Sequence, residues 1–520
     1  MSGWQQHLPI IPVVLPLVFA ATLLVIDEQR RIWKRSVSLL GLLLLLASAL
    51  ALLRDADAGI PLVYRLGGWP APFGIVLVGD RLAALMVLLA SLLGLAAYLF
   101  SCARWDRAGP RFHCLLHALL MGVNGAFLTG DLFNLFVFFE VLLAASYGLA
   151  LHGSGRARVQ ASLHYIIVNL VASLLFLVGV SLIYGMTGTL NMAELSVQVP
   201  LVAAADQPLL LAAAALLGMA FLIKAGIWPL CFWLPRSYAT ACAPAAALFA
   251  ILTKVGIYAV LRLWLLFFGG AAGGDGSFGR DWLVVLGLAT LAFGALGVFG
   301  TRDLSKFAAF SLISSCGTLL AAIGAAQVGV STAALYYLLA STLGVSALFL
   351  LVEVIERSRA PDADIRAITE ETYGSFESEG FEEVGVAIPA TWALLGISFI
   401  VCMLLLAGLP PMPGFIGKLA LLDALLGLPV VGPSTWVLLT LLMLSGLATV
   451  IAASRIGVRI FWAAEQTLSV RISRGEVMAI LFLLGMAFVL VLQAGRIMQY
   501  LEAAAQSLHA PVSYLEGVLP

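Results

Sequence analysis

The sequence has few charged residues. They make up 11% of its 520 residues, whereas hydrophobic residues make up 62%. A soluble globular chain has about 25% charged residues, and about half of its residues are apolar. The shortage excludes a water-soluble domain, because this much apolar surface exceeds what a core can bury and must face lipid. The net charge is zero, so the chain also lacks the basic field that attracts nucleic acid.

Cysteine is scarce as well, and none of the six cysteines forms a C-x-x-C pair. They are scattered within or beside apolar runs, which is typical of small buried hydrophobic residues and not of a metal or disulfide site. The chain lacks the G-x-x-x-x-G-K-[ST] loop that binds ATP, and it has no haem, flavin or iron–sulfur pattern. We therefore expect no cofactor and no metal. Energy must come from an ion gradient or from a partner protein.

Long polar stretches are nearly absent, since apolar runs follow one another along the chain. A helix needs about 20 mostly apolar residues to cross a bilayer. The runs therefore predict an all-α integral membrane protein with about 14 spanning helices. The run 408–414 interrupts the twelfth span, and Trp228-Pro229 follows the seventh, so both helices are expected to be broken. The predicted spans are 9–26, 37–53, 82–99, 112–129, 132–151, 163–184, 209–227, 245–265, 282–299, 307–323, 333–352, 393–428, 436–453 and 477–493.

Basic residues fall mainly on one side of these spans. If the loop after the first span is cytoplasmic, 19 of the 28 Lys and Arg residues lie on that side and six on the other. Because cytoplasmic loops are enriched in Lys and Arg, this bias predicts a multi-pass protein with both termini on the opposite, periplasmic side. The one long polar stretch, 353–383, is acidic. We expect a solvated cytoplasmic loop there, with a partner-docking loop as the alternative.

Four ionisable residues lie inside apolar spans: Glu140, Lys224, Lys254 and Lys418. A charge at the bilayer centre costs about 2.5–3.5 kcal/mol even on insertion scales, and such residues mark ion or proton pathways. An acid and a base shielded from water can exchange a proton, so Glu140 and Lys224 predict a proton switch that the other lysines extend into a relay. The alternatives are a purely structural Glu–Lys pair, snorkelling of Lys254 to an interface, and a structural role for Lys418.

Proline lies beside two of these lysines. Pro229 follows Lys224, and Pro410 and Pro411 precede Lys418. Interrupted helices at comparable places in two halves of a chain are typical of inverted-repeat transporters, with the unwound backbone covered by protein or water. The expected division is 1–111 as an N-terminal three-helix segment, 112–265 as the first repeat, 282–453 as the second, and 454–520 as a last helix and tail.

Three histidines are weaker candidates. His113 and His117 are four residues apart on one helix face, as zinc ligands can be. No third ligand is visible, so we interpret them as part of a water-filled polar path or as packing. His164 opens the sixth span, where an interfacial histidine and a proton-entry group are both consistent with the sequence.

Five stretches carry a recognisable pattern: 130–140 (GDLFNLFVFFE), 184–193 (YGMTGTLNMA), 232–235 (FWLP), 252–258 (LTKVGIY) and 414–418 (GFIGK). They resemble the D subunits of the Mrp-type (Mnh or Pha) monovalent cation/proton antiporters. The resemblance runs over nearly the whole chain. The broader family includes the antiporter-like proton-pumping subunits of respiratory complex I.

This resemblance implies fourteen helices, with two inverted five-helix repeats (helices 4–8 and 9–13) and broken helices 7 and 12. It implies that Glu140 is the essential glutamate and that Lys224, Lys254 and Lys418 are the lysines of the ion pathway. It also implies a bacterial inner (plasma) membrane location, in a hetero-oligomeric complex with partners of the A, B, C, E, F and G type. Such complexes exchange sodium, or in some relatives potassium, for protons.

The eleventh predicted helix departs from the family pattern. Relatives often carry a histidine around Ala340 and Ser341, and complex I homologues often carry a lysine near Val345. Neither residue is present here. Water, Ser341 or Thr342 would then carry protons past this helix, or protons would leave by another protein of the complex. The sequence thus predicts a non-enzymatic, proton-translocating subunit of a Na⁺(K⁺)/H⁺ antiporter. A redox-driven pump subunit of a complex I or membrane-hydrogenase assembly is the alternative, and a non-transporting membrane scaffold is a third.

Overall fold

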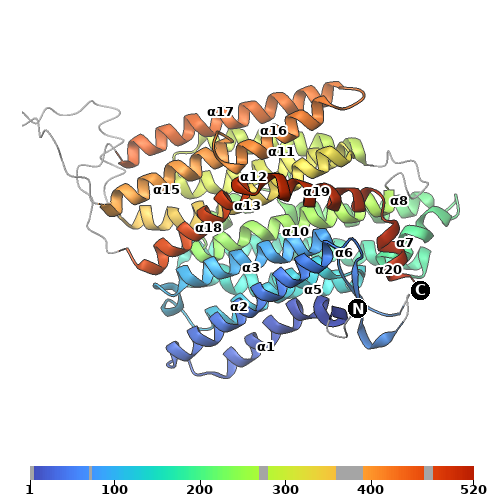
Figure 1. The fold of residues 1–520 in the computed structure, drawn as a ribbon, viewed down its shortest axis with the longest axis horizontal. Helices are drawn as coiled ribbons and strands as arrows, with labels where there is room; N and C mark the ends of the chain where they lie inside the picture. The colour runs from blue at the N-terminus through green and yellow to red at the C-terminus, as the bar shows by residue number, and fades with distance from the viewer. Residues whose placement is uncertain (1–4, 70–72, 269–278, 359–389, 462–471, 520) are drawn as a thin grey trace, which may run out of the picture.

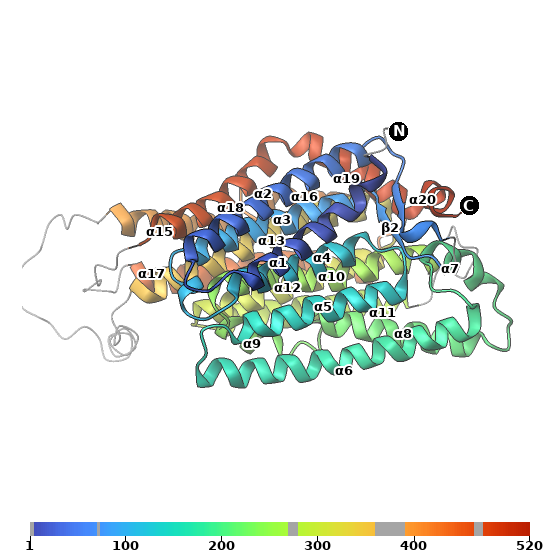
Figure 2. The same cartoon turned by 90° about the horizontal axis from the view of Figure 1, so that it is seen from below.

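The protein is a bundle of long helices that run roughly along a common direction (Figures 1 and 2). The structure, a computed structural model, describes residues 5–69, 73–268, 279–358, 390–461 and 472–519. Both chain termini lie at one end of the bundle, here called the terminal end, and the α1–α2 turn lies at the opposite end. An even number of crossings between the two ends is consistent with this arrangement.

The described residues of the first part of the chain form ten α-helices, four short 3-10 helices and one β-hairpin. The two hairpin strands pair antiparallel, with Leu62 opposite Gly79 and Arg65 opposite Val76. The elements are η1 (Gln5–Ile10), α1 (Ile11–Val25), α2 (Arg31–Ala56), β1 (Leu62–Arg65), η2 (Leu66–Gly68), β2 (Val76–Gly79), α3 (Arg81–Ser101), η3 (Trp105–Arg107), α4 (Phe112–Leu128), α5 (Leu132–Leu151), α6 (Arg156–Thr187), α7 (Met192–Gln198), η4 (Val199–Leu201), α8 (Gln207–Ala225), α9 (Leu234–Thr240) and α10 (Ala243–Phe268).

The described elements of the second part of the chain are all helices. The predicted acidic loop, 353–383, lies outside the described residues from position 359 onward. The elements are α11 (Arg280–Gly300), α12 (Leu304–Gly324), α13 (Val328–Ser358), α15 (Ala390–Ala407), α16 (Pro413–Leu426), α17 (Pro433–Phe461), α18 (Arg474–Leu492), α19 (Ala494–His509) and α20 (Val512–Val518).

Four helices, α3, α10, α12 and α13, form the buried centre of the bundle. At least 83% of the most apolar window of each is buried, compared with at most 50% in the other long helices. The outer helices therefore expose apolar faces, as helices in lipid do. Within the described ranges, 13 helices are long and apolar enough to cross a membrane, and the apolar α4 is slightly shorter. The predicted all-α integral membrane class is confirmed.

Two helices end inside the bundle. Helix α8 ends at Ala225 and is followed by Gly226 with a φ of 68°, a conformation that glycine adopts without strain. Helix α15 ends at Ala407 and is followed by Gly408 with a φ of 79°. The chain then resumes as α9 and as α16, respectively. These interruptions lie where the sequence predicted the broken seventh and twelfth helices.

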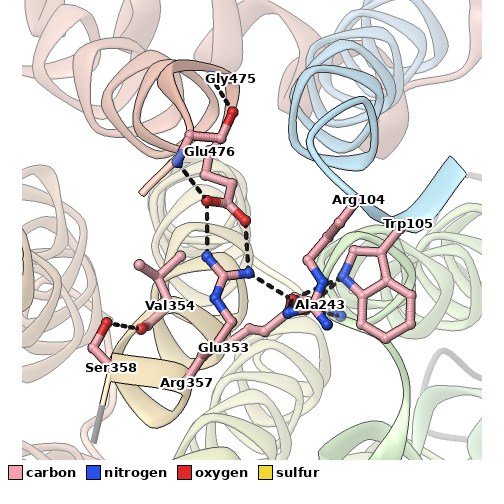
Figure 3. A network of polar contacts seen from close by, with 10 residues as sticks. Arg104, Trp105, Ala243, Glu353, Val354, Arg357, Ser358, Gly475 and Glu476 are labelled. Atoms are coloured by element: carbon pink, nitrogen blue, oxygen red, sulfur yellow. Dashed lines mark hydrogen bonds and ion pairs between the residues drawn. The ribbon is translucent and has the colours of Figure 1, made fainter. Parts of the chain in front are cut away.

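Charged residues join several helices at the opposite end (Figure 3). Arg357 on α13 donates two hydrogen bonds to Glu476 on α18, each 2.8 Å long. Glu353, one turn earlier on α13, accepts hydrogen bonds from the indole N–H of Trp105 at 2.7 and 2.9 Å and from the backbone N–H of Ala243 at 3.3 Å. Because buried charges require partners, this network fixes the ends of α13, α18 and α10 relative to one another.

Candidate functional site

Glu140, Ser173 and Lys224 meet where α5, α6 and the end of α8 pack together. The Ser173 hydroxyl donates a hydrogen bond to Oε1 of Glu140 and accepts one, 3.2 Å long, from Nζ of Lys224. Nζ of Lys224 also lies 4.9 Å from the centre of the Phe139 ring, within reach of a cation–π interaction. Lys224 is 5% exposed and Ser173 is 6% exposed. The predicted acid and base are thus joined through a hydroxyl and not by a direct ion pair.

Lys254 is fully buried near the middle of α10 and points toward α12. Its Nζ donates hydrogen bonds to Oγ of Ser315 at 2.5 Å and to Sγ of Cys316 at 3.3 Å. Its exposed fraction is 0%, so it does not snorkel to the surface of this chain. Like Lys224, this lysine meets a serine hydroxyl on a neighbouring helix and no carboxylate.

Lys418 lies on α16 and reaches back to the end of α15. Its Nζ donates hydrogen bonds to the carbonyl oxygens of Ala407 at 2.8 Å and Leu406 at 3.4 Å. The last carbonyls of a helix lack partners within that helix and carry the negative end of its dipole. The interruption between α15 and α16 therefore provides the acceptors that stabilise the ammonium group.

A narrow polar cavity lies between the surroundings of Lys254 and Lys418. It leaves about 20 Å³ for the centres of water molecules, whereas one water needs roughly 10–15 Å³. Ser315 and Lys418 both line it, so the cavity reaches the partner of one lysine and the side chain of the other. The other polar residues that line it are Ser311, Ser314, Tyr337, Ser341, Ser445 and Thr449.

The structure distinguishes Ser341 from Thr342, the two residues whose hydroxyls the sequence suggested as carriers of protons past α13. Ser341 lines the cavity. Thr342 is not among the lining residues, although both hydroxyls donate to the carbonyl oxygen of Leu338 on their own helix, at 3.2 Å for Ser341 and 2.6 Å for Thr342. Neighbouring residues on a helix point in directions about 100° apart, since one turn takes 3.6 residues. The geometry therefore favours Ser341.

The remaining sequence candidates lie apart from these contacts. His164 is exposed on α6, and its Nδ1 lies 3.1 Å from the carbonyl oxygen of Gln160 one turn earlier. The structure does not bring it to Glu140 or to the lysines. Pro229 lies in the turn after α8, and Pro410 and Pro411 lie between α15 and α16.

His113 and His117 occupy the buried side of α4. Nε2 of His117 lies 3.2 Å from Oγ of Ser38, and Nε2 of His113 lies 4.0 Å from the Asp106 carboxylate. Within the described ranges, no cluster of three or more His, Cys, Asp or Glu side chains is suited to hold a metal ion. Each ring thus has a polar neighbour outside α4, Ser38 for His117 and Asp106 for His113.

Sequence reasoning missed three contact residues: Ser173, Ser315 and Cys316. A signal was present for the first, because Asn169 and Ser173 are four residues apart in an otherwise apolar run and so share a helix face. Serines are common in spanning helices, however, and their spacing does not show which of them faces a lysine.

A bundle of spanning helices with two interruptions, three buried lysines and a part-buried glutamate defines the class of antiporter-like membrane subunits. A family model described as "NADH:quinone oxidoreductase/Mrp antiporter, TM" matches residues 129–452, the region that contains all four ionisable residues. The chain belongs to this family, on the branch of the Mrp-type D subunits.

Similar proteins cover the chain from end to end. It is 51% identical to the D subunit of a probable K(+)/H(+) antiporter of Rhizobium meliloti, over 100% of this chain and 98% of that one. It is 33% identical to the D subunit of a Na(+)/H(+) antiporter of Alkalihalophilus pseudofirmus, over 99% of this chain and 100% of that one. A chain in the solved structure of the Mrp complex from Dietzia sp. DQ12-45-1b has a TM-score of 0.84 at 29% identity, with both chains covered completely. The predicted family resemblance is confirmed.

Proposed function

We propose that this chain is the proton-translocating subunit of a multisubunit antiporter that exchanges potassium or sodium for protons across a bacterial plasma membrane. The observation that carries the proposal is the set of buried lysines, each bonded to a hydroxyl or to a helix-end carbonyl inside the bundle. The relatives named as K(+)/H(+) and Na(+)/H(+) antiporter subunits support the substrate class. The neighbouring structure of an Mrp complex supports a multisubunit assembly, in which the family resemblance implies partners of the A, B, C, E, F and G type.

The proposed route begins at Glu140 and passes to Lys224 and then to Lys254. Helix α10 lies directly against the end of α8 at this level: a Cβ on Gly256 would come within 2.8 Å of the backbone nitrogen of Ala225. Gly256 is two residues from Lys254, and Ala225 follows Lys224. The two lysines therefore occupy neighbouring positions on packed helices, where no residue larger than glycine fits between the backbones.

From Lys254 the proposed route continues through Ser315 and the cavity to Lys418. Water and hydroxyl groups both accept and donate protons, so a cavity lined with hydroxyls can take the place of an ionisable group on α13. Ser341 is the hydroxyl that α13 itself contributes to the cavity. A water-filled passage at membrane depth fits the broken backbone between α15 and α16, which requires cover by protein or water.

The proposed orientation places the terminal end in the periplasm and the opposite, more basic end in the cytoplasm. We also propose that residues 112–265 and 282–453 form two inverted repeats, after an N-terminal segment of residues 1–111 and before a C-terminal part of residues 454–520. In each proposed repeat, one interrupted helix lies beside a buried lysine. The subunit passes ions along without catalysing a covalent reaction on a substrate.

Everted membrane vesicles that contain the whole complex test this function. A proton gradient is established by respiration and monitored with a pH-sensitive dye, and potassium or sodium salt is then added. We expect either cation to discharge the gradient, compared with vesicles from the same host without the complex. Absence of discharge with both cations would contradict antiport. Proton movement that depended on an electron donor to the complex itself would favour the redox-driven alternative.

A further inference from the structure

Ser173 is the group that separates Glu140 from Lys224. We propose that the proton moves between these two residues through the Ser173 hydroxyl, which makes Ser173 a relay residue and not a packing residue. This inference rests on the proposed function of the chain. It adds a residue on α6 to a pathway that the sequence places on α5, α8, α10 and α16.

The bonding of Ser173 differs from that of Ser146 and Ser315, two other buried serines of the bundle. Serine in a helix usually donates its hydroxyl hydrogen to a carbonyl three or four residues earlier. Ser146 and Ser315 do so with Leu143 and Leu312, at 2.7 and 2.8 Å. Ser173 instead donates to a carboxylate on another helix. Its hydroxyl is thus turned away from its own backbone and toward the two ionisable residues.

The hydrogen bonds are oriented for transfer. Nζ of Lys224 donates to Oγ of Ser173, and Oγ donates its own hydrogen to Oε1 of Glu140. In the transfer toward Glu140, an N–H bond of the ammonium breaks and an O–H bond forms on Ser173, while the original serine O–H bond breaks and its hydrogen binds the carboxylate. The reverse transfer, in the direction of the proposed route, breaks and forms the same bonds in the opposite sense. The products are a neutral amine, an unchanged serine and a neutral carboxylic acid. No electrons are gained or lost, and the summed charge stays zero.

An interposed hydroxyl also explains why the pair can release its proton. A direct ion pair between an ammonium and a carboxylate is a strong charge-assisted contact that holds the proton on the amine. Here the ammonium meets a neutral oxygen and the face of Phe139. The Ser173 hydroxyl lies between this ammonium group and the carboxylate of Glu140. The carboxylate is therefore further from the ammonium group than in a direct ion pair, and it holds the proton on the lysine less firmly.

Threonine and valine at position 173 test the relay, because they have nearly the same shape and differ in the hydroxyl. We expect Ser173→Thr to keep at least half of the wild-type antiport rate in everted vesicles. We expect Ser173→Val to lower the maximal rate by roughly 100-fold or more, the scale of a lost proton-transfer group, and to leave the half-saturating cation concentration unchanged. Both variants should assemble into the complex at wild-type levels, measured by immunoblot.

Ser181→Val is the matched control, since Ser181 lies on the same helix and its hydroxyl donates to the carbonyl oxygen of Leu177, away from the site. Its antiport should equal that of the wild type. Equal rates for Ser173→Thr and Ser173→Val would overturn the relay, whether both rates were at the wild-type level or both were reduced. Failure of the relay alone is distinguishable from failure of the proposed function, because in that case wild-type vesicles still show antiport and Glu140→Gln vesicles do not.

Discussion

Lys418 donates a hydrogen bond to the carbonyl oxygen of Ala407, the last residue of α15, over 2.8 Å. A helix that ran on without interruption would use that carbonyl for its own backbone. The break between α15 and α16 therefore creates the acceptor for the lysine. The break after α8 acts differently, since it ends the helix one residue after Lys224, whose ammonium group bonds to the neighbouring α6.

Gly408→Ala should displace Lys418 from this position. A Cβ on Gly408 would lie 2.5 Å from Cδ of Lys418, and the φ of 79° at this residue is strained for alanine by roughly 1–3 kcal/mol. We expect antiport in everted vesicles, normalised to assembled complex, to fall by at least about tenfold. Gly300→Ala is the control, because nothing lies within 4 Å of a Cβ built there. Wild-type antiport in Gly408→Ala would contradict this role of the break.

Ser341 distinguishes a water path from a direct hydroxyl path. The cavity between Lys254 and Lys418 has a volume of about 20 Å³ for the centres of water molecules, which is room for about one water molecule. Ser341→Leu fills part of this space. We expect this variant to lose most antiport activity. Ser341→Ala keeps the space open to water and should lose less than half. Wild-type activity in both variants would show that the cavity is not on the route, and equal losses in both would show that the route needs the Ser341 hydroxyl itself.

Gly256→Ala should destabilise the bundle where α10 meets α8. The added Cβ would come within 2.9 Å of two backbone atoms, the nitrogen of Ala225 and the carbonyl oxygen of Phe221. Overpacking of this kind costs about 1–3 kcal/mol, so we expect the melting temperature of the purified complex to fall by several degrees. Gly218→Ala, on α8 with nothing within 4 Å of its Cβ, should leave it unchanged. A drop in both variants, or in neither, would contradict the close contact.

Arg262→Ala should prevent stable assembly. Nη2 of Arg262 donates to both carboxylate oxygens of Asp80, at 2.8 and 2.7 Å, and the arginine is 5% exposed. Removing one partner of a buried ion pair costs about 3–5 kcal/mol, because the other charge is left without compensation. We expect little assembled complex in membranes on an immunoblot, and partial recovery when Asp80→Asn is combined with it. The exposed Arg54, at the same end of the bundle, is the control through Arg54→Ala.

The sequence predicted the spans and the four ionisable residues because the bilayer imposes strong rules on both. A run of about 20 apolar residues and a charge within it are visible without a structure. The partners of the lysines are not visible in this way. Ser173 and the carbonyl of Ala407 are chosen by how α6 packs on α8 and how α16 folds back on α15. Ser341 and its neighbour Thr342 are equivalent in sequence, and the helix direction alone separates them.

The most direct test of the proposed pathway is antiport by a Glu140→Gln variant in everted vesicles that contain the whole complex. Glutamine keeps the shape of the side chain and still accepts a hydrogen bond from Ser173, but it cannot take up and release the proton. Lys224→Ala is measured in parallel, and Glu502→Gln, at an exposed position on α19, is the control. We predict that the first two variants assemble and discharge no proton gradient with potassium or sodium. Wild-type discharge by assembled Glu140→Gln complexes would contradict the proposal that this part-buried acid carries protons.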